Sequence, residues 1–205
     1  MLKVTNVNVM NFENAIRGAR NPLDSWAKSD SYRQESNYIL GPEDLGLAKR
    51  LRQAGPDHRT FMRQIFASMD ITAPLYWWKE FDTYKVGTCA NSCSTMHTIH
   101  KKEFTLSDFS FEAFKEDKVD MYILKTDIVD RLNYLRDQFL STKDKKYWLQ
   151  MIQLLPSSFN QLRTVTMTYE NLVNMYHARK NHKLDEWHVL CDVIKSLPYA
   201  EDLIL

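Results

Sequence analysis

The feature that most constrains the fold is a long stretch of helical periodicity that stops just before a β-like segment. In residues 120–155 the apolar side chains recur at spacings of three and four, which predicts amphipathic helices with a charged break at Lys143–Lys146. Pro156 ends this stretch, and residues 161–168 are rich in threonine and valine, as strands are. We therefore expect a mixed α/β fold.

Shorter segments repeat this mixture of strands and helices. Residues 2–10 are rich in β-branched side chains, and residues 65–71 alternate apolar side chains with others, so both are predicted strands. Helices are predicted from the cap Asn11 as far as Arg20, for residues 42–54 with Gly55 just past the end, and onward from Pro74, because residues typical of helix boundaries flank them. Loops are predicted for residues 23–40 and 84–98.

Composition and charge argue against several classes of protein. The 205 residues suit one domain, 1–205, and contain no repeat or clear linker. With 27 basic and 26 acidic residues, the net charge of +1 gives no reason to expect nucleic acid as a partner. No apolar run approaches the roughly 18 residues of a membrane span, so no membrane partner is expected. Three cysteines fit a reducing compartment, and we expect a cytoplasmic protein.

Generic motifs give little evidence of chemistry. None of the five glycines forms a dinucleotide-binding or P-loop pattern. Cys89 and Cys93 precede two histidines, which suggests zinc, but the C-x-x-C spacing is missing and no metal site is predicted. A nucleophilic role for either cysteine lacks an identified base. The expected role of three tryptophans is core packing: Trp77, Trp78 and Trp187.

Two segments of the chain resemble the flavin-dependent thymidylate synthases. In Ala73–His97, Asn91 and Ser94 reproduce the N-x-x-S spacing of the family's S-x-N-x-x-S-x-R-Y motif, and Cys89 falls on its first serine. In Leu154–Ile194, a Leu-Pro pair after a long helix, a Thr-rich strand and a helix with an N-x-x-x-L-R end follow the family's order. The matching residues of this second segment are Leu155, Pro156, Leu172, Asn174 and Arg179.

This resemblance implies a fold, an activity and an assembly. The fold would be α/β (α+β), with a central, mostly antiparallel sheet flanked by long helices. The activity would be methylation of dUMP to dTMP, or of a related pyrimidine nucleotide, with FAD, NADPH and methylene-tetrahydrofolate. The family is tetrameric, so the resemblance also implies a homotetramer with sites shared between subunits.

The chain departs from the family at several positions where the family has arginine. The Arg-His-Arg triplet falls on Tyr84, Lys85 and Val86, or one residue earlier if the preceding helix is shorter. Other family arginines fall on Met96, Ile152 and Glu170. In the family those arginines hold the flavin and the nucleotide phosphate, so their loss removes the bidentate donors that a phosphate prefers.

Seven residues remain candidates for ligand contacts. Arg179 matches the family's nucleotide-contacting arginine. The other substrate-binding candidates are Ser94 and Ser92, whose backbone would meet the phosphate through N–H groups, and Lys85, which would supply a point charge. The flavin-binding candidates are Asn174, Asn91 and Tyr84.

Several of these candidates also have a purely structural explanation. Arg179 would suit a helix C-terminus as a cation, Asn91 would suit a loop cap, and Lys85 would suit a solvated loop. The alternative function is therefore a module that keeps the fold and binds a nucleotide or a protein without catalysis. Cations that would restore phosphate binding from other positions are Arg63, Arg163, Lys101 and Lys102.

Overall fold

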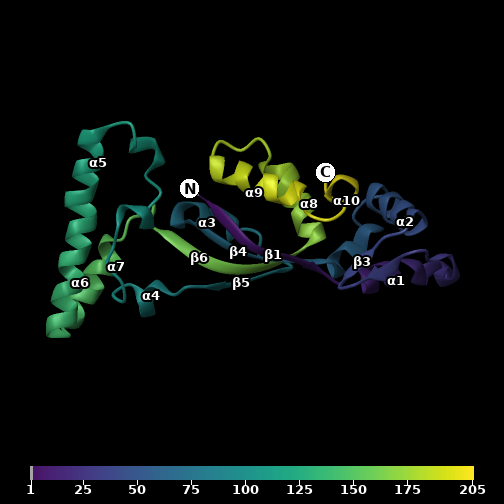
Figure 1. Ribbon diagram of the computed structural model, residues 1–205, viewed down its shortest axis with the longest axis horizontal. Coiled ribbons are helices and arrows are strands. Elements are labelled where there is room, and N and C mark those ends of the chain that lie inside the picture. Colours follow the sequence, from purple (N-terminus) through teal and green to yellow (C-terminus); the bar gives the residue numbers. More distant parts are fainter. Residues whose placement is uncertain (1) are drawn as a thin grey trace. The chain divides into compact units, whose positions relative to one another are not determined.

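A computed structural model describes residues 2–205 and contains both sheet and helix (Figure 1). One sheet has four strands in the order β1-β4-β6-β5, and the pairing of two further strands makes a hairpin. The strands are β1 (Lys3–Met10), β2 (Tyr32–Gln34), β3 (Asn37–Ile39), β4 (Phe66–Pro74), β5 (Thr88–Ser92) and β6 (Asn160–Thr168). The predicted mixed α/β class with an antiparallel sheet is confirmed.

Helices account for most of the remaining elements. The α-helices are α1 (Phe12–Arg20), α2 (Pro42–Gln53), α3 (Leu75–Phe81), α4 (Thr95–Thr98), α5 (Lys118–Leu124), α6 (Arg131–Thr142), α7 (Lys145–Leu154), α8 (Tyr169–Arg179), α9 (Asp185–Lys195) and α10 (Ala200–Leu203). A 3-10 segment, Arg59–Gln64, precedes β4, and a π-helical segment, Lys125–Asp130, joins α5 to α6. None of the helices in residues 2–205 has the length and apolarity needed to cross a membrane.

The chain forms two compact units. The first unit consists of Ile71–Thr83 and Asn91–Arg163 with a short N-terminal piece ending at Lys3. The second unit consists of Val4–Asp70, Tyr84–Ala90 and Thr164–Leu205.

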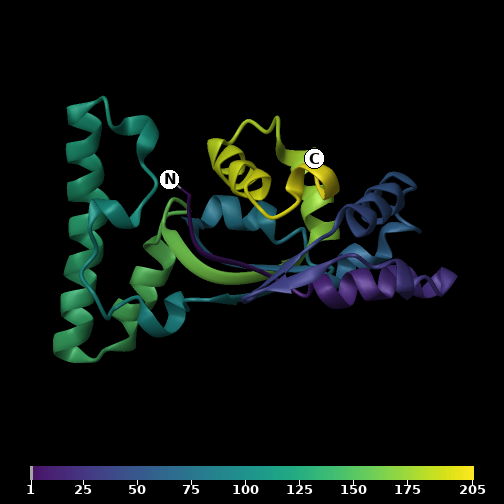
Figure 2. The same cartoon turned by 45° about the vertical axis from the view of Figure 1, so that its right-hand side comes forward.

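The first unit is built around a helical hairpin, with α6 and α7 side by side (Figures 1 and 2). Lys143 takes a left-handed conformation with φ of 58°, and Asp144 then caps α7 by accepting a hydrogen bond of 2.9 Å from the Lys146 N–H. This confirms the predicted break. The hairpin packs on an aromatic cluster in which the rings of Phe109 and Phe111 stack at 5.3 Å.

Helix α3 buries three large aromatic side chains in the first unit. Trp77, Trp78 and Phe81 are each at most 2% exposed. The Trp78 indole N–H donates a hydrogen bond of 3.0 Å to the Gln161 carbonyl, and the Arg163 guanidinium lies 4.2 Å from the centre of the Trp78 ring. The predicted core roles of Trp77 and Trp78 are confirmed.

In the second unit, α8 and α9 lie side by side (Figure 2). The apolar stripe of α9, which includes Trp187, is buried, as its three- and four-residue spacing predicts. In the same unit, Phe12 meets the rings of Tyr169 and Tyr199 edge to face, each at 5.4 Å.

Two predicted loops contain regular structure instead. Residues 23–40 include the β2–β3 hairpin, and residues 84–98 include β5 and α4. Most of β5 is exposed, so its sequence, Thr88–Ser92, shows no alternation of apolar side chains that would reveal a strand.

A buried ion pair joins α1 to α2 in the second unit. The Arg20 Nε donates to the Asp44 carboxylate at 2.5 Å, and the two side chains are 4% and 0% exposed. Burial raises the pKa of Asp44, but hydrogen bonds from Ser31, Ser29 and Arg20 outweigh it, so the pKa lies below its ordinary value of 3.8. The stabilisation is therefore fully present above pH 3.8 and is lost as the pH falls through the lowered pKa.

We predict that Asp44→Asn lowers the free energy of unfolding by about 3 kcal/mol, because it leaves the Arg20 guanidinium buried without its counter-charge. Urea titrations above and below pH 4 measure this loss, which should shrink on the acid side. Asp202→Asn is the matched control, since its ion pair with Lys49 is partly exposed and should contribute at most about 1 kcal/mol. Equal losses in the two variants would contradict the assignment.

Candidate functional site

The candidate site lies in the second unit, where β6 ends and α8 begins. The Thr168 hydroxyl accepts a hydrogen bond of 3.2 Å from the Asn171 N–H, and the Asn171 side-chain oxygen accepts one of 3.2 Å from the Thr168 N–H. This reciprocal capping box satisfies two backbone donors and fixes where the helix starts. It directs the first turn of α8 beside the end of the strand.

The turn before β5 is tied to the same capping box. The Asn171 amide donates a hydrogen bond of 2.6 Å to the Val86 carbonyl. Gly87 has a φ of +71°, and a Cβ added there would lie 2.7 Å from the Asn171 side-chain oxygen. Only glycine satisfies both conditions without strain, so this turn brings Thr88 and Cys89 beside α8.

A pocket of about 520 Å³ lies between these segments. Its hydrogen-bonding side chains are Arg63, Thr88, Cys89, Thr166, Thr168, Glu170 and Asn171. The Thr88 hydroxyl oxygen is buried and has no hydrogen-bond partner among the described residues. A buried hydroxyl without a partner costs free energy, which a ligand with a polar group would recover.

Two arginines from the 3-10 segment Arg59–Gln64 converge on Glu170 at this pocket. Arg63 makes a close ion pair with the Glu170 carboxylate, and the Arg59 Nε lies 3.4 Å from it. Burial raises the pKa of Glu170, but hydrogen bonds and charges from Arg63 and Arg59 outweigh it, so its pKa lies below the ordinary value. The carboxylate is therefore charged at neutral pH.

The predicted residues Arg179 and Tyr84 meet in the second unit. The Arg179 Nε donates a hydrogen bond of 2.8 Å to the Tyr84 hydroxyl. The Arg179 guanidinium also lies 4.6 Å from the centre of the Trp187 ring. These contacts hold the guanidinium in one orientation, more firmly than a solvated helix end requires.

The other two predicted residues of the second unit are Asn174 and Lys85. Asn174 is exposed, and its side-chain oxygen accepts a hydrogen bond of 3.2 Å from Arg59. Asn174 thus joins the arginine cluster at the pocket. Lys85 is exposed in the turn before β5.

Three predicted residues belong to the first unit. Asn91 and Ser92 end β5 and are exposed, while Ser94 is the residue before α4. The Ser94 carbonyl accepts a hydrogen bond of 2.7 Å from the Thr98 hydroxyl, and no side-chain bond from Ser94 caps the helix.

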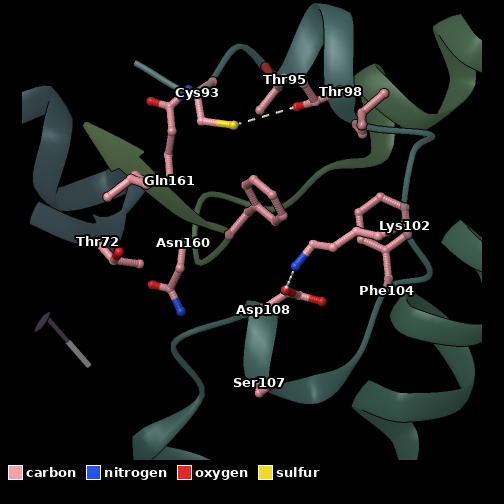
Figure 3. A pocket seen from close by; sticks show the side chains of 13 residues that line it. Thr72, Cys93, Thr95, Thr98, Lys102, Phe104, Ser107, Asp108, Asn160 and Gln161 are labelled. Atoms are coloured by element: carbon pink, nitrogen blue, oxygen red, sulfur yellow. Dashed lines mark hydrogen bonds and ion pairs between the residues drawn. The ribbon is translucent and has the colours of Figure 1, made fainter. Parts of the chain in front are cut away.

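A second, smaller pocket of about 250 Å³ lies in the first unit near Ser94 (Figure 3). Lys102 makes a close ion pair with Asp108 at its edge, and the Cys93 sulfur lies 3.8 Å from the Thr98 hydroxyl. The Gln161 amide donates to the Cys93 carbonyl at 3.0 Å. Because these polar groups already have partners, the pocket offers weaker evidence of a ligand than the pocket beside α8.

Sequence patterns alone did not identify several residues of the larger pocket. Arg63 was a candidate only by its charge, while Arg59 and Asn171 were not candidates. A Thr-x-x-Asn pattern after a predicted strand is the signal that would have placed the start of α8. Two of the other cations named from charge are already engaged: Arg163 pairs with Asp82 at 2.7 Å and Lys102 makes a close ion pair with Asp108.

No metal site emerges from the described part of the chain. Residues 2–205 contain no group of three or more histidine, cysteine, aspartate or glutamate side chains placed to hold an ion. Cys89 and Cys93 are free and exposed, and Cys191 is free and buried.

We predict that Gly87→Ala lowers the free energy of unfolding by about 1–2 kcal/mol, because alanine disfavours a positive φ and would press on the hydrogen-bonded Asn171. Gly46→Ala is the control: Gly46 lies within α2 with only the flexible Arg50 side chain nearby, and alanine there should stabilise by about 0.5–1 kcal/mol. Chemical denaturation of both variants measures the difference. A stabilising effect of Gly87→Ala would refute this account of the turn.

Comparison with known proteins supports the fold through structure rather than sequence. No family model and no curated protein matches the sequence. Solved structures do match. Two of them are thymidylate synthase X (ThyX) from Helicobacter pylori with FAD and dUMP, and the flavin-dependent thymidylate synthase ThyX from Helicobacter pylori complexed with FAD and dUMP.

Both matches extend over nearly the whole chain. The first has a TM-score of 0.70 at 16% identity and covers 100% of this chain and 97% of the other. The second has a TM-score of 0.70 at 18% identity and covers 98% of each chain. The protein therefore has the fold of the flavin-dependent thymidylate synthases, as the resemblance of its motifs implied.

Proposed function

We propose that this protein is a flavin-dependent thymidylate synthase-like enzyme that binds a pyrimidine nucleotide and FAD and methylates the pyrimidine. The observation that carries the proposal is the full-length structural match to ThyX structures that contain FAD and dUMP. The proposed substrate is dUMP or a related pyrimidine nucleotide. NADPH and methylene-tetrahydrofolate would be the co-substrates.

The pocket beside α8 fits part of such a ligand set. Its volume of about 520 Å³ lies within the usual range of roughly 300–1,000 Å³ for small-molecule sites. The buried Thr88 hydroxyl and the Arg63 guanidinium suit the polar and anionic groups of a nucleotide. These observations support nucleotide binding in the second unit.

Residue roles follow the resemblance position by position. Arg179 would contact the substrate through its planar guanidinium, oriented by Tyr84 and Trp187. Tyr84 and Asn174 would contact the flavin. The remaining proposed contacts are Lys85, Ser92 and Ser94 for the substrate and Asn91 for the flavin.

The chemistry divides between the cofactor and the chain. When bound, FAD supplies hydride transfer, the difficult step, which no side chain of this protein needs to perform. The chain's own residues would bind and orient the pyrimidine, and their positive charges would pair with the phosphate of the nucleotide. A homotetramer, as in the family that the sequence resembles, is proposed as the assembly.

One observation favours a second candidate, a nucleotide-binding module without catalysis. Glu170 places a carboxylate where the resembling family has an arginine that holds a ligand. An anion there disfavours a phosphate at the same position unless the arginines beside it compensate. Ligand binding is common to both candidates, so turnover distinguishes them.

We predict that the purified protein binds FAD with the absorbance of a flavoprotein and converts dUMP to dTMP when NADPH and methylene-tetrahydrofolate are present. Absorbance titration measures the first step and chromatography of the nucleotides the second. Binding without product would support the non-catalytic module. A colourless protein with no affinity for FAD or dUMP would rule out both candidates.

We further predict that Arg179→Lys weakens dUMP binding by about tenfold or more, because lysine keeps the charge but loses the planar donors. Calorimetric titration measures the effect. Arg163→Lys is the matched control, because Arg163 also stacks on a tryptophan but pairs with Asp82 in the first unit. Similar affinities in Arg179→Lys and the unmodified protein would argue against a substrate contact.

A further inference from the structure

We propose that Arg63 binds the phosphate group of a nucleotide in the pocket beside α8, exchanging its ion pair with Glu170 for the phosphate. The inference rests on the proposed function and adds the residue that anchors the anion. Arg63 and Glu170 both line the pocket, so this exchange needs only a rotation of the Arg63 side chain.

Exposure separates the two arginines of the cluster. The side chains of Arg59 and Glu170 are 14% and 12% exposed, whereas that of Arg63 is 57% exposed. Arg59 also donates a hydrogen bond of 3.2 Å to Asn174. Arg59 and Glu170 are therefore held in place by burial and hydrogen bonds, and the Arg63 side chain is the member of the cluster that can rotate.

The charge of the cluster allows the exchange. Two guanidinium groups face one carboxylate, so Glu170 keeps the Arg59 charge beside it when Arg63 turns away. The exposed Asp57 adds a weaker favourable interaction with Arg63. A phosphate monoester or a pyrophosphate carries more charge than a carboxylate and accepts two parallel N–H bonds from one guanidinium, so it competes well for an exposed arginine.

The surroundings of Arg63 suit a phosphate ester. Thr88, Thr166 and Thr168 line the same pocket. The hydroxyls of Thr166 and Thr168 already bond to Ser68 and Asn171, whereas the Thr88 hydroxyl is buried without a hydrogen-bond partner among the described residues. A hydroxyl donates readily to a phosphate oxygen. The shared chemistry is a phosphate group, which either a pyrimidine nucleotide or the flavin dinucleotide would bring.

Matched ligands with and without phosphate test the inference on the full chain. Calorimetric titrations compare dUMP with deoxyuridine, which lacks only the phosphate, and FAD with riboflavin, which lacks the pyrophosphate together with the adenosine. In the unmodified protein we expect the phosphorylated member of at least one pair to bind more tightly. In Arg63→Gln we expect the ratio of the two affinities to fall by about 10- to 100-fold, with no change in the affinity for the member that lacks phosphate.

Three further variants separate anchoring from a structural role. Arg63→Lys should recover part of the advantage, because a point charge remains. Glu170→Gln should increase the advantage, since it releases Arg63; a merely structural pair would give the opposite result. Arg33→Gln is the control, because Arg33 forms an exposed ion pair with Glu13 away from the pocket and should change nothing.

The outcomes distinguish this inference from the proposed function. If Arg63→Gln lowers the affinity advantage of dUMP over deoxyuridine alone, Arg63 binds the phosphate of the substrate. If it lowers the advantage of FAD over riboflavin alone, Arg63 binds the phosphates of the flavin. An advantage that Arg63→Gln leaves intact overturns the inference while the proposed function stands. Failure of the unmodified protein to bind any of the four ligands overturns both.

Discussion

Asn171 makes the hydrogen bonds on which the candidate site depends, since one side chain ties three segments together. Its oxygen accepts from the backbone and hydroxyl of Thr168, at 3.2 and 2.6 Å, and its amide donates to the Val86 carbonyl at 2.6 Å. The first contacts begin α8 at the end of β6, and the last brings the turn at Gly87 against the helix. These hydrogen bonds of Asn171 therefore hold the segments that line the pocket at fixed positions relative to one another.

Electrostatics then decide what such a pocket accepts. The protein as a whole is nearly neutral, with a net charge of +1, so attraction for an anion must be local. Around Glu170 there is such a local attraction for an anion, because Arg59 and Arg63 both come from one short segment, Arg59–Gln64. The family that the sequence resembles has an arginine at the position of Glu170. Here the cations come from a different element, Arg59–Gln64, and they would give the proposed pocket its attraction for phosphate.

The sequence predicted the elements that bury apolar side chains and missed those that do not. Strand β4 and the helices that precede Pro156 followed from periodicity, because burial imposes a pattern on sequence. Strand β6 followed from its content of threonine and valine. Strand β5 lies largely exposed, and burial therefore left no pattern in Thr88–Ser92. The contact of Arg179 with Tyr84 was not predictable, because the two residues lie far apart in the chain. The cluster around Glu170 depends on side-chain geometry, of which charge alone revealed only Arg63.

The central claim is that the pocket beside α8 holds the phosphate of a nucleotide. The most direct measurement is a crystal structure of the protein grown with dUMP and FAD. The account predicts density for a phosphate within hydrogen-bonding distance of the Arg63 guanidinium, with Glu170 retained by Arg59. A nucleotide bound elsewhere, with the ion pair between Arg63 and Glu170 unchanged and the pocket filled by water alone, would contradict it.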